Sequence, residues 1–184
     1  MHLLRAILTG LLLIGLSAPA LSDQTDLRLN GLFDRLLAAP GPAEAALVEQ
    51  QIWSIWLETP DDAVADDVER GVAAMQRGDF STALEVFDRV IDLAPDYAEG
   101  WNKRATLHYL MENFDASLAD IARTLELEPR HFGALSGRGV VYIKMKDLER
   151  ALTSFEAALA VSPQMVGPRV NAEALRRLLR EREI

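Results

Sequence analysis

The sequence predicts an all-α solenoid of stacked helix-turn-helix units, and three observations lead to that fold class. Pro95, Pro129 and Pro163 lie 34 residues apart, a spacing typical of helical repeats. Four further columns keep the same period with one kind of side chain each: small at Gly71, Ala105 and Gly139; small at Ala83, Ser117 and Ala151; bulky at Phe87, Ile121 and Phe155; leucine at Leu84, Leu118 and Leu152. Hydrophobic residues make up 49% of the 184 residues, which provides enough apolar surface for a core.

Each unit is predicted to contain two helices with a short break between them. The break falls at Gly78-Asp79, Glu112-Asn113 and Lys146-Asp147. Glycine and asparagine tolerate the left-handed conformation that ends a helix, and a short polar side chain helps to start the next one. The second helix ends before the proline of each unit, because proline disfavours helical geometry in the residue ahead of it. A single hairpin cannot hide its apolar face, so neighbouring units must stack.

The columns resemble the tetratricopeptide repeat, whose pattern runs W-x2-L-G-x2-Y, then A-x3-F, then P. The matching residues are Asp67, Arg70, Gly71, Ala74, Ala83, Phe87 and Pro95 in the first copy; Trp101, Arg104, Ala105, His108, Ser117, Ile121 and Pro129 in the second; and Leu135, Arg138, Gly139, Tyr142, Ala151, Phe155 and Pro163 in the third. The resemblance implies a right-handed superhelix of three units, residues 64–97, 98–131 and 132–165.

One column departs from the family pattern in all copies. Arginine replaces the family's leucine at Arg70, Arg104 and Arg138. We expect this arginine to place a solvated stem along the groove of the superhelix.

Residues 25–60 are predicted to form a helical hairpin before the repeats. Apolar residues recur at helical spacing on both sides of a break at 39–42: Leu27, Leu29, Leu32, Phe33, Leu36 and Leu37 in the first helix, and Ala46, Leu47, Ile52, Trp53, Ile55 and Trp56 in the second. The second helix is expected to stop near Thr59-Pro60. Since the spacing does not match the repeat columns, we expect a divergent hairpin packed on the first repeat. Trp53 and Trp56 have two interpretations, core filling at that junction or an exposed aromatic anchor for a partner.

Residues 168–184 are predicted to form a capping helix, because an open solenoid needs a terminal element with a polar outer side. One face of this helix carries Val170, Ala174, Leu175, Leu178 and Leu179, and the other carries Arg169, Arg176, Arg177, Arg180 and Arg182. The arginines indicate either a solvated face or a patch for anionic lipids. The interspersed Glu173, Glu181 and Glu183 favour the solvated face.

Residues 1–20 have the order of regions of a secretory signal. His2 and Arg5 precede an apolar stretch, residues 6–16, and Ser17-Ala18-Pro19-Ala20 supplies the small residues of a cleavage site. We predict cleavage after Ala20, with Ser22 as the alternative site. An uncleaved anchor is disfavoured because the apolar run is shorter than the roughly 20 residues that a bilayer requires. The chain is therefore expected to be exported, to the periplasm in a Gram-negative source, without stable membrane insertion after cleavage.

Composition and motifs disfavour several classes of function. The formal net charge of −9 disfavours nucleic acid as a partner, and the absence of cysteine removes disulfides and thiolate chemistry. His108 occupies a column where the family has tyrosine, so we expect its side chain to pack between helices. His131 follows Pro129 at a boundary between units, so we expect its side chain to cap the loop there. The sequence contains no metalloprotease, nucleotide-binding or serine-hydrolase motif. We predict no enzymatic activity, no cofactor and no metal.

Acidic residues gather at the start of the first repeat, at Asp61, Asp62, Asp66, Asp67 and Glu69. Calcium prefers several oxygen ligands, but the D-x-D-x-D-G order of a calcium loop is missing. We interpret these residues as favouring the positive N-terminal end of the next helix.

Function is predicted to lie in a concave groove, which stacked hairpins form because each unit rotates slightly relative to the last. The family resemblance assigns to this groove Val68, Val72, Met75, Asn102, Thr106, Tyr109, Ser136, Val140 and Ile143. This mixture of apolar and hydrogen-bonding side chains suits a peptide or a partner helix. The family's chaperone-binding members hold a terminal carboxylate with lysines, asparagines and an arginine. Here only Asn102-Lys103 resembles that set. At the matching positions of the first copy, Val68 has no side-chain donor and the charge of Glu69 would repel a carboxylate, so we predict no carboxylate clamp.

Charge is divided unevenly along the chain. Residues 21–100 hold 17 acidic and 5 basic residues, whereas residues 101–184 hold 11 and 13. Such a field can steer a protein partner with a basic segment. We predict a non-enzymatic adaptor or assembly factor that binds another envelope protein; the alternative is a structural accessory subunit of an envelope enzyme or secretion complex. The oligomeric state stays open, because imperfect caps permit end-to-end stacking.

Overall fold

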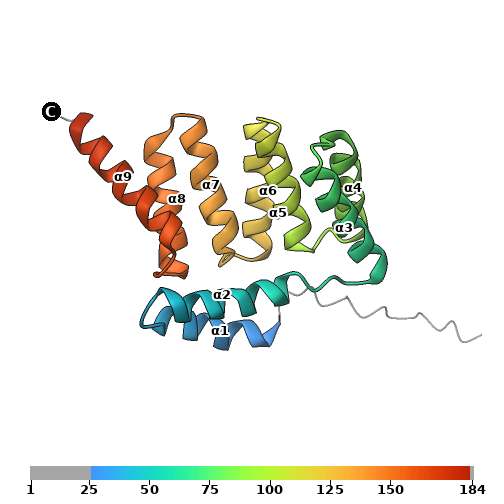
Figure 1. Cartoon of the computed structure of the whole chain (residues 1–184), viewed down its shortest axis with the longest axis horizontal. Helices are drawn as coiled ribbons and strands as arrows, with labels where there is room; N and C mark the ends of the chain where they lie inside the picture. Colours follow the sequence, from blue (N-terminus) through green and yellow to red (C-terminus); the bar gives the residue numbers. More distant parts are fainter. Residues whose placement is uncertain (1–25, 183–184) are drawn as a thin grey trace, which may run out of the picture.

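The computed structural model describes residues 26–182, and this part of the chain forms nine α-helices and no strand (Figure 1). Six of the helices pair as three successive hairpins: α3 (Asp62–Gln76) with α4 (Phe80–Leu93), α5 (Ala98–Leu110) with α6 (Phe114–Leu127), and α7 (Phe132–Lys144) with α8 (Leu148–Val161). A hairpin of α1 (Leu27–Ala38) and α2 (Pro42–Trp56) precedes them, and α9 (Val166–Arg182) packs on α8. The predicted solenoid of helix-turn-helix repeats is confirmed.

A left-handed residue follows the first helix of each of the three repeat hairpins, α3–α4, α5–α6 and α7–α8. Gly78, Glu112 and Lys146 have φ of 75°, 60° and 62°. Glycine adopts this conformation without strain, whereas glutamate and lysine hold it at a cost. The next residue starts the second helix: the side chains of Asp79 and Asp147 accept hydrogen bonds from backbone N–H groups three residues ahead.

The small columns allow the paired helices to approach closely, as the sequence predicts. A Cβ atom added to Gly71 would lie 2.7 Å from the Phe87 ring, and one added to Gly139 would lie 2.8 Å from the Phe155 ring. Both phenylalanines are fully buried. The bulky column therefore fills the space that the small column leaves.

The arginine column does not lie along the groove in the second and third repeats, so that expectation is wrong for Arg104 and Arg138; Arg70 pairs with Asp67 of its own helix at 2.8 Å. Arg104 donates two hydrogen bonds to Asp120 on the partner helix, each 2.8 Å long, and one of 2.7 Å to Asp88. Sixteen residues separate Arg104 from Asp120, and the same separation joins Arg138 to Ser154 through a bond of 3.1 Å. The guanidinium groups of Arg104 and Arg138 turn toward the second helix because a carboxylate or hydroxyl partner is available there.

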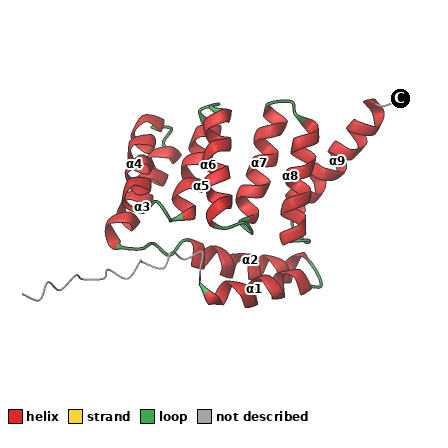
Figure 2. Cartoon of the chain, turned by 180° about the vertical axis from the view of Figure 1, so that it is seen from behind, coloured by secondary structure: helices red, strands yellow, loops and turns green. Residues whose placement is uncertain are grey.

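The hairpin α1–α2 lies across the ends of the repeat helices, and both views show it beneath them (Figures 1 and 2). Its buried apolar cluster includes Phe132 from the start of α7, and Val161 and Met165 pack against that cluster. Arg130, between α6 and α7, donates a hydrogen bond of 3.0 Å to Asn30 and places its guanidinium 4.1 Å from the centre of the Phe33 ring.

The expectation that this hairpin packs on the first repeat is therefore wrong. The aromatic rings near the end of α2 pack against His131 and Phe132, at the junction of the second and third repeats. A link at residues 57–61 then leads to α3 at the other end of the stack (Figure 1).

The helix α9 covers the last repeat with a narrower apolar face than the sequence predicts. Pro168, Ala172 and Leu175 are its buried residues. Val170 and Leu178 are 59% and 49% exposed, so their predicted place on the packed face is wrong. Within residues 26–182, no helix combines the length and apolar character needed to cross a bilayer. The predicted signal, residues 1–20, lies outside the described residues.

Candidate functional site

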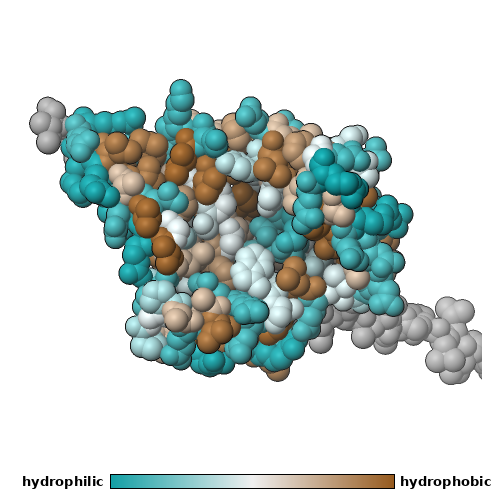
Figure 3. Space-filling model, viewed as in Figure 1, coloured by the Kyte–Doolittle hydropathy of each residue, from teal (hydrophilic) through white to brown (hydrophobic). Residues whose placement is uncertain are grey.

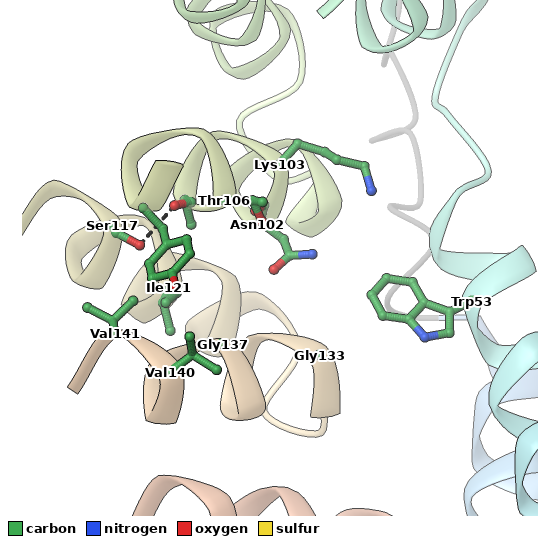
Figure 4. Close-up of a pocket in the computed structure, with 12 residues that line it drawn as sticks. Trp53, Asn102, Lys103, Thr106, Ser117, Ile121, Gly133, Gly137, Val140 and Val141 are labelled. Atoms are coloured by element: carbon green, nitrogen blue, oxygen red, sulfur yellow. Dashed lines mark hydrogen bonds between the residues drawn. The ribbon is translucent and has the colours of Figure 1, made fainter. Parts of the chain in front are cut away.

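A cavity of about 380 Å³ opens on one face of the molecule, where the space-filling view is hollowed between the repeats and the hairpin (Figure 3). Four helices contribute to its lining: α2, α5, α6 and α7. The lining residues are Trp53, Asn102, Lys103, Ala105, Thr106, Tyr109, Ser117, Ile121, Gly133, Gly137, Val140 and Val141. We call this cavity the Trp53 pocket (Figure 4).

Helix α5 provides the hydrogen-bonding side of the pocket. Asn102, Thr106 and Tyr109 occur at intervals of four and three residues, so they share one helix face. The Thr106 hydroxyl donates to the Asn102 carbonyl oxygen at 3.0 Å, and Thr106 is exposed. The Tyr109 ring packs on Phe114, with 6.2 Å between the ring centres. The helix therefore fixes these side chains while leaving polar atoms facing the groove.

Helix α7 provides a side of the pocket with few side-chain atoms. A Cβ atom added to Gly133 would lie 2.7 Å from Trp53 Cζ2, so this glycine allows α2 to approach. A Cβ atom added to Gly137, one turn later, would meet nothing within 4 Å. Val140 continues the same face and adds an apolar surface. The pocket thus exists because α7 has glycine at both of these positions.

Helix α2 closes the pocket with an aromatic side chain. Trp53 faces the residues of α5 and α7 across the opening (Figure 4). It packs edge-on against Trp56 and Phe132, with ring centres 5.3 and 5.7 Å apart. Trp56 is 1% exposed and belongs to the core, whereas Trp53 is half-buried. Of the two interpretations of this pair, core filling holds for Trp56, and Trp53 both packs against the core and lines the pocket.

A buried carboxylate lies beneath the polar side of the pocket. Glu99 is 1% exposed, and its Oε1 lies 2.5 Å from Lys103 Nζ. Its Oε2 accepts hydrogen bonds from Asn102 Nδ2 at 2.8 Å and from His131 Nε2 at 3.1 Å. Burial raises the pKa of this carboxyl, but the bond from His131 and the charge of Lys103 outweigh burial, and the pKa of Glu99 lies below its ordinary value.

His131 joins this carboxylate to the hairpin. Its Nδ1 accepts a hydrogen bond from the Ala134 backbone N–H at 3.0 Å, which caps α7 as the sequence predicts. Because Nδ1 accepts, the ring N–H that faces Glu99 is on Nε2 and donates to Glu99 Oε2. The ring also stacks on Trp56, with centres 4.2 Å apart and planes 7° apart. One chain of contacts therefore connects the groove at Asn102, the repeat junction at His131 and the hairpin at Trp56.

The structure brings together some of the predicted groove residues and not others. Asn102, Thr106, Tyr109 and Val140 line the Trp53 pocket. The remaining predicted residues lie outside its lining: Val68, Val72, Met75, Ser136 and Ile143. Val72 and Met75 pack on the Phe87 cluster, Val68 packs on a cluster around Val64, and Ile143 packs on the Phe155 cluster. The site is thus centred on the second and third repeats.

Sequence reasoning missed Glu99, Gly133 and Gly137. The repeat alignment contains a signal for the two glycines, because both fall on the first helix of the third unit and match none of the family's glycine positions. Glu99 gave no such signal. Its role depends on contacts with His131, 32 residues away, which the alignment of repeats does not reveal.

The residues considered for chemistry have structural partners. Asp61 caps α3 by accepting a hydrogen bond of 2.9 Å from the Val64 backbone N–H. Asp67 is fully buried between Arg70 and Arg89, at 2.8 and 2.6 Å. His108 Nε2 lies 3.7 Å from Asp120. Among residues 26–182, no three acidic or histidine side chains are grouped so as to hold a metal ion.

Comparison with known families gives a match over the repeats. The family model described as tetratricopeptide repeat matches residues 68–111 and 102–166. Together the two matches cover more than half of the chain.

Known proteins show similarity over the same part of the chain. A TPR repeat-containing protein of Rhizobium etli is 34% identical over 106 residues, which are 58% of this chain and 52% of that protein. The tetratricopeptide repeat protein 36 homolog of Nematostella vectensis is 30% identical over 106 residues, 54% of this chain and 55% of that protein. The chain therefore spans about half the length of these relatives.

Among solved structures, the first TPR of Spaghetti (RPAP3) bound to an HSP90 peptide has a similar fold. The TM-score is 0.60 at 19% identity, with 63% of this chain and 92% of that chain covered.

Proposed function

The chain belongs to the tetratricopeptide repeat family, and on that premise we propose that it is a non-enzymatic interaction module that binds a peptide or partner helix in its groove. The observation that carries the proposal is the Trp53 pocket, where Asn102, Thr106 and Tyr109 face apolar side chains and a half-buried tryptophan. A concave, mainly apolar site with a few fixed polar groups is the usual form of a ligand pocket.

The comparisons support a peptide as the ligand. The Spaghetti domain, which has a similar fold, is described as bound to an HSP90 peptide. A grip on a terminal carboxylate is not part of the proposal, because Lys103 is already paired with Glu99 and Asn102 donates to the same carboxylate. The excess of acidic residues over residues 21–100 instead favours a partner with a basic segment.

We further propose that the chain acts in the periplasm as an adaptor or assembly factor. The support is the order of charged, apolar and small residues over positions 1–20. Mass measurement of the mature protein should give a chain that begins at Leu21. A mature chain that retains Met1 would contradict the export proposal and leave the groove proposal standing.

The groove proposal is tested with a matched pair of arginine substitutions. Thr106 on α5 and Thr153 on α8 are both exposed, and each hydroxyl donates to the carbonyl four residues earlier at 3.0 Å. Thr106→Arg places a long charged side chain in the groove, whereas Thr153→Arg places it outside the pocket lining. The wild type and both variants are used to capture proteins from envelope extract, and each retained protein is identified, purified and titrated.

A partner retained by the wild type and by Thr153→Arg, but bound at least tenfold more weakly by Thr106→Arg, supports groove recognition. Equal affinity of all three chains for every retained protein would contradict it. That result, with a large complex recovered each time, would favour a structural accessory subunit.

A further inference from the structure

We propose that the Trp53 pocket receives one bulky, uncharged apolar side chain of an extended peptide segment that carries a basic residue next to that side chain. The proposal rests on the groove function proposed above and names the chemistry of its ligand. It is drawn from the size of the pocket, the glycine on its wall, its hydrogen-bonding rim and the charges around it.

The volume and walls of the pocket suit a single apolar side chain. Its volume of about 380 Å³ is near the lower end of the range for ligand pockets, roughly 300 to 1,000 Å³. Ile121 and Val140 supply aliphatic surface, and the ring of Trp53 closes the opposite side. An aromatic or large aliphatic side chain that enters this space would leave water and contact three apolar groups.

The wall on α7 is open because of a glycine that the fold does not require. A side chain at Gly137 would meet no atom within 4 Å of its Cβ, unlike one at Gly133, which would strike Trp53. Glycine is less favourable than alanine inside a helix. A larger residue at 137 would therefore be compatible with the fold and would occupy the space that we assign to the ligand.

The polar rim favours an extended backbone over a helix. Asn102 Nδ2 donates to Glu99 Oε2, and the reverse amide orientation would place an oxygen against a carboxylate. The amide is thus fixed with Oδ1 available to accept a hydrogen bond. A helix satisfies its own backbone N–H groups, whereas an extended segment carries N–H groups that need such an acceptor.

The charges around the pocket disfavour an acidic peptide side chain inside it and favour a basic residue next to that side chain in the peptide. Lys103, the one charged residue of the lining, is neutralised by Glu99 at 2.5 Å. Beyond the end of α2, exposed acidic residues follow at Asp61 in the link and at Asp62 in the first turn of α3, whereas Glu58 is already paired with Arg28 at 2.7 Å. A basic residue beside the apolar anchor would be attracted to this link, and the attraction would weaken as salt rises.

The test selects ligands from a displayed library of random heptapeptides with the full chain as bait. Recovered peptides are synthesised, and their affinities are measured by fluorescence anisotropy at low and moderate salt. Gly137→Leu fills the pocket, and Gly31→Leu on α1 is the matched control, because a Cβ at either position meets nothing within 4 Å. We expect peptides that share one bulky apolar residue next to lysine or arginine. Their affinity should fall at least tenfold with Gly137→Leu and stay within twofold with Gly31→Leu.

A second measurement is made on the wild type and uses a variant only to assign one resonance. The indole N–H resonance of Trp53, assigned with Trp53→Phe, should shift on titration with a selected peptide. It should not shift with the same peptide when alanine replaces its bulky residue. A Trp53 resonance that both peptides shift equally would overturn the pocket assignment.

The remaining outcomes separate this proposal from the groove function. If Thr106→Arg abolishes peptide binding while Gly137→Leu retains it, the groove binds peptides but the pocket proposal is wrong. Selection of acidic or wholly polar peptides would also overturn it. If the wild type recovers no peptide, the pocket proposal is wrong, whereas the groove proposal, which includes a partner helix, is decided by the titrations with Thr106→Arg and Thr153→Arg.

Discussion

At the scale of single residues, two glycines on the same helix have opposite roles. Gly133 makes room for Trp53, since its Cβ would lie 2.7 Å from that ring. Gly137 leaves open space, because apart from its own stretch of helix nothing lies within 4 Å of the position of its Cβ. The same residue type thus serves packing at one position and an open wall at the other.

Alanine substitutions at these two positions should therefore change stability in opposite directions. Gly133→Ala should lower the free energy of unfolding by about 1 to 3 kcal/mol, because Trp53 must move. Gly137→Ala should raise it by about 0.5 to 1 kcal/mol, because alanine is the better helix former and meets no obstacle. Urea denaturation of both variants checks the pair. Equal changes in the two free energies would show that Trp53 does not contact α7.

The buried carboxylate predicts a pH dependence of stability. The pKa of Glu99 lies below its ordinary value of 4.5, so in the folded state the charged form is favoured. A depressed pKa contributes stability above the ordinary value, and that contribution is lost as the pH falls below about 4.5.

Glu99→Gln should remove this contribution. The variant should be less stable than the wild type by about 2 kcal/mol at pH 7, the scale of hydrogen bonds to a charged group. The difference should shrink as the pH is lowered below 4.5, the ordinary value for this carboxyl. The midpoints of urea unfolding of the wild type and the variant, taken from pH 7 to pH 3, measure this difference in stability. A difference that is constant over this range would mean that the pKa of Glu99 is the same in the folded and the unfolded state, which would contradict the lowered pKa.

At the scale of the elements, local patterns predict the repeats well. The period of 34 residues, the turn pairs and the prolines place α3 to α8, because each of these signals acts on neighbouring backbone. The apolar pattern of α9 is less informative. Among the described helices, α9 packs mainly on α8, so only one of its faces is covered, and its leucines at 175 and 178 differ in burial, at 4% and 49% exposed.

This difference gives a matched test within one helix. Leu175→Ala should lower the free energy of unfolding by about 2 to 5 kcal/mol, because it leaves a cavity against α8. Leu178→Ala should change it by no more than about 0.5 kcal/mol, since its side chain is half-exposed. Thermal and urea unfolding of the two variants measure the effect. Similar losses would place both leucines in the packed face that the sequence pattern predicts.

At the scale of the whole molecule, the position of the hairpin could not be predicted from the sequence. The hydrogen bond between Arg130 and Asn30 joins residues 100 apart, and the one between Ser162 and Glu49 joins residues 113 apart. No periodic pattern encodes such contacts, which depend on the fit of individual side chains. The groove residues of α5 were predictable from the repeat register. The Trp53 wall was not, because it comes from an element outside the repeats.

The placement of the hairpin over the second and third repeats is the central claim of this account, because it creates the Trp53 pocket. The chain contains no cysteine, so introduced pairs can be linked selectively. Asn30→Cys with Arg130→Cys joins positions whose native side chains lie 3.0 Å apart. Asn30→Cys with Arg70→Cys instead reports contact with the first repeat.

The most direct measurement is the yield of intramolecular cross-link that a short bismaleimide forms in each double variant, with the linked peptides identified by mass spectrometry. We predict efficient linking of positions 30 and 130 and none of positions 30 and 70. Linking of 30 to 70 without linking of 30 to 130 would place the hairpin on the first repeat and remove the wall of the proposed binding site.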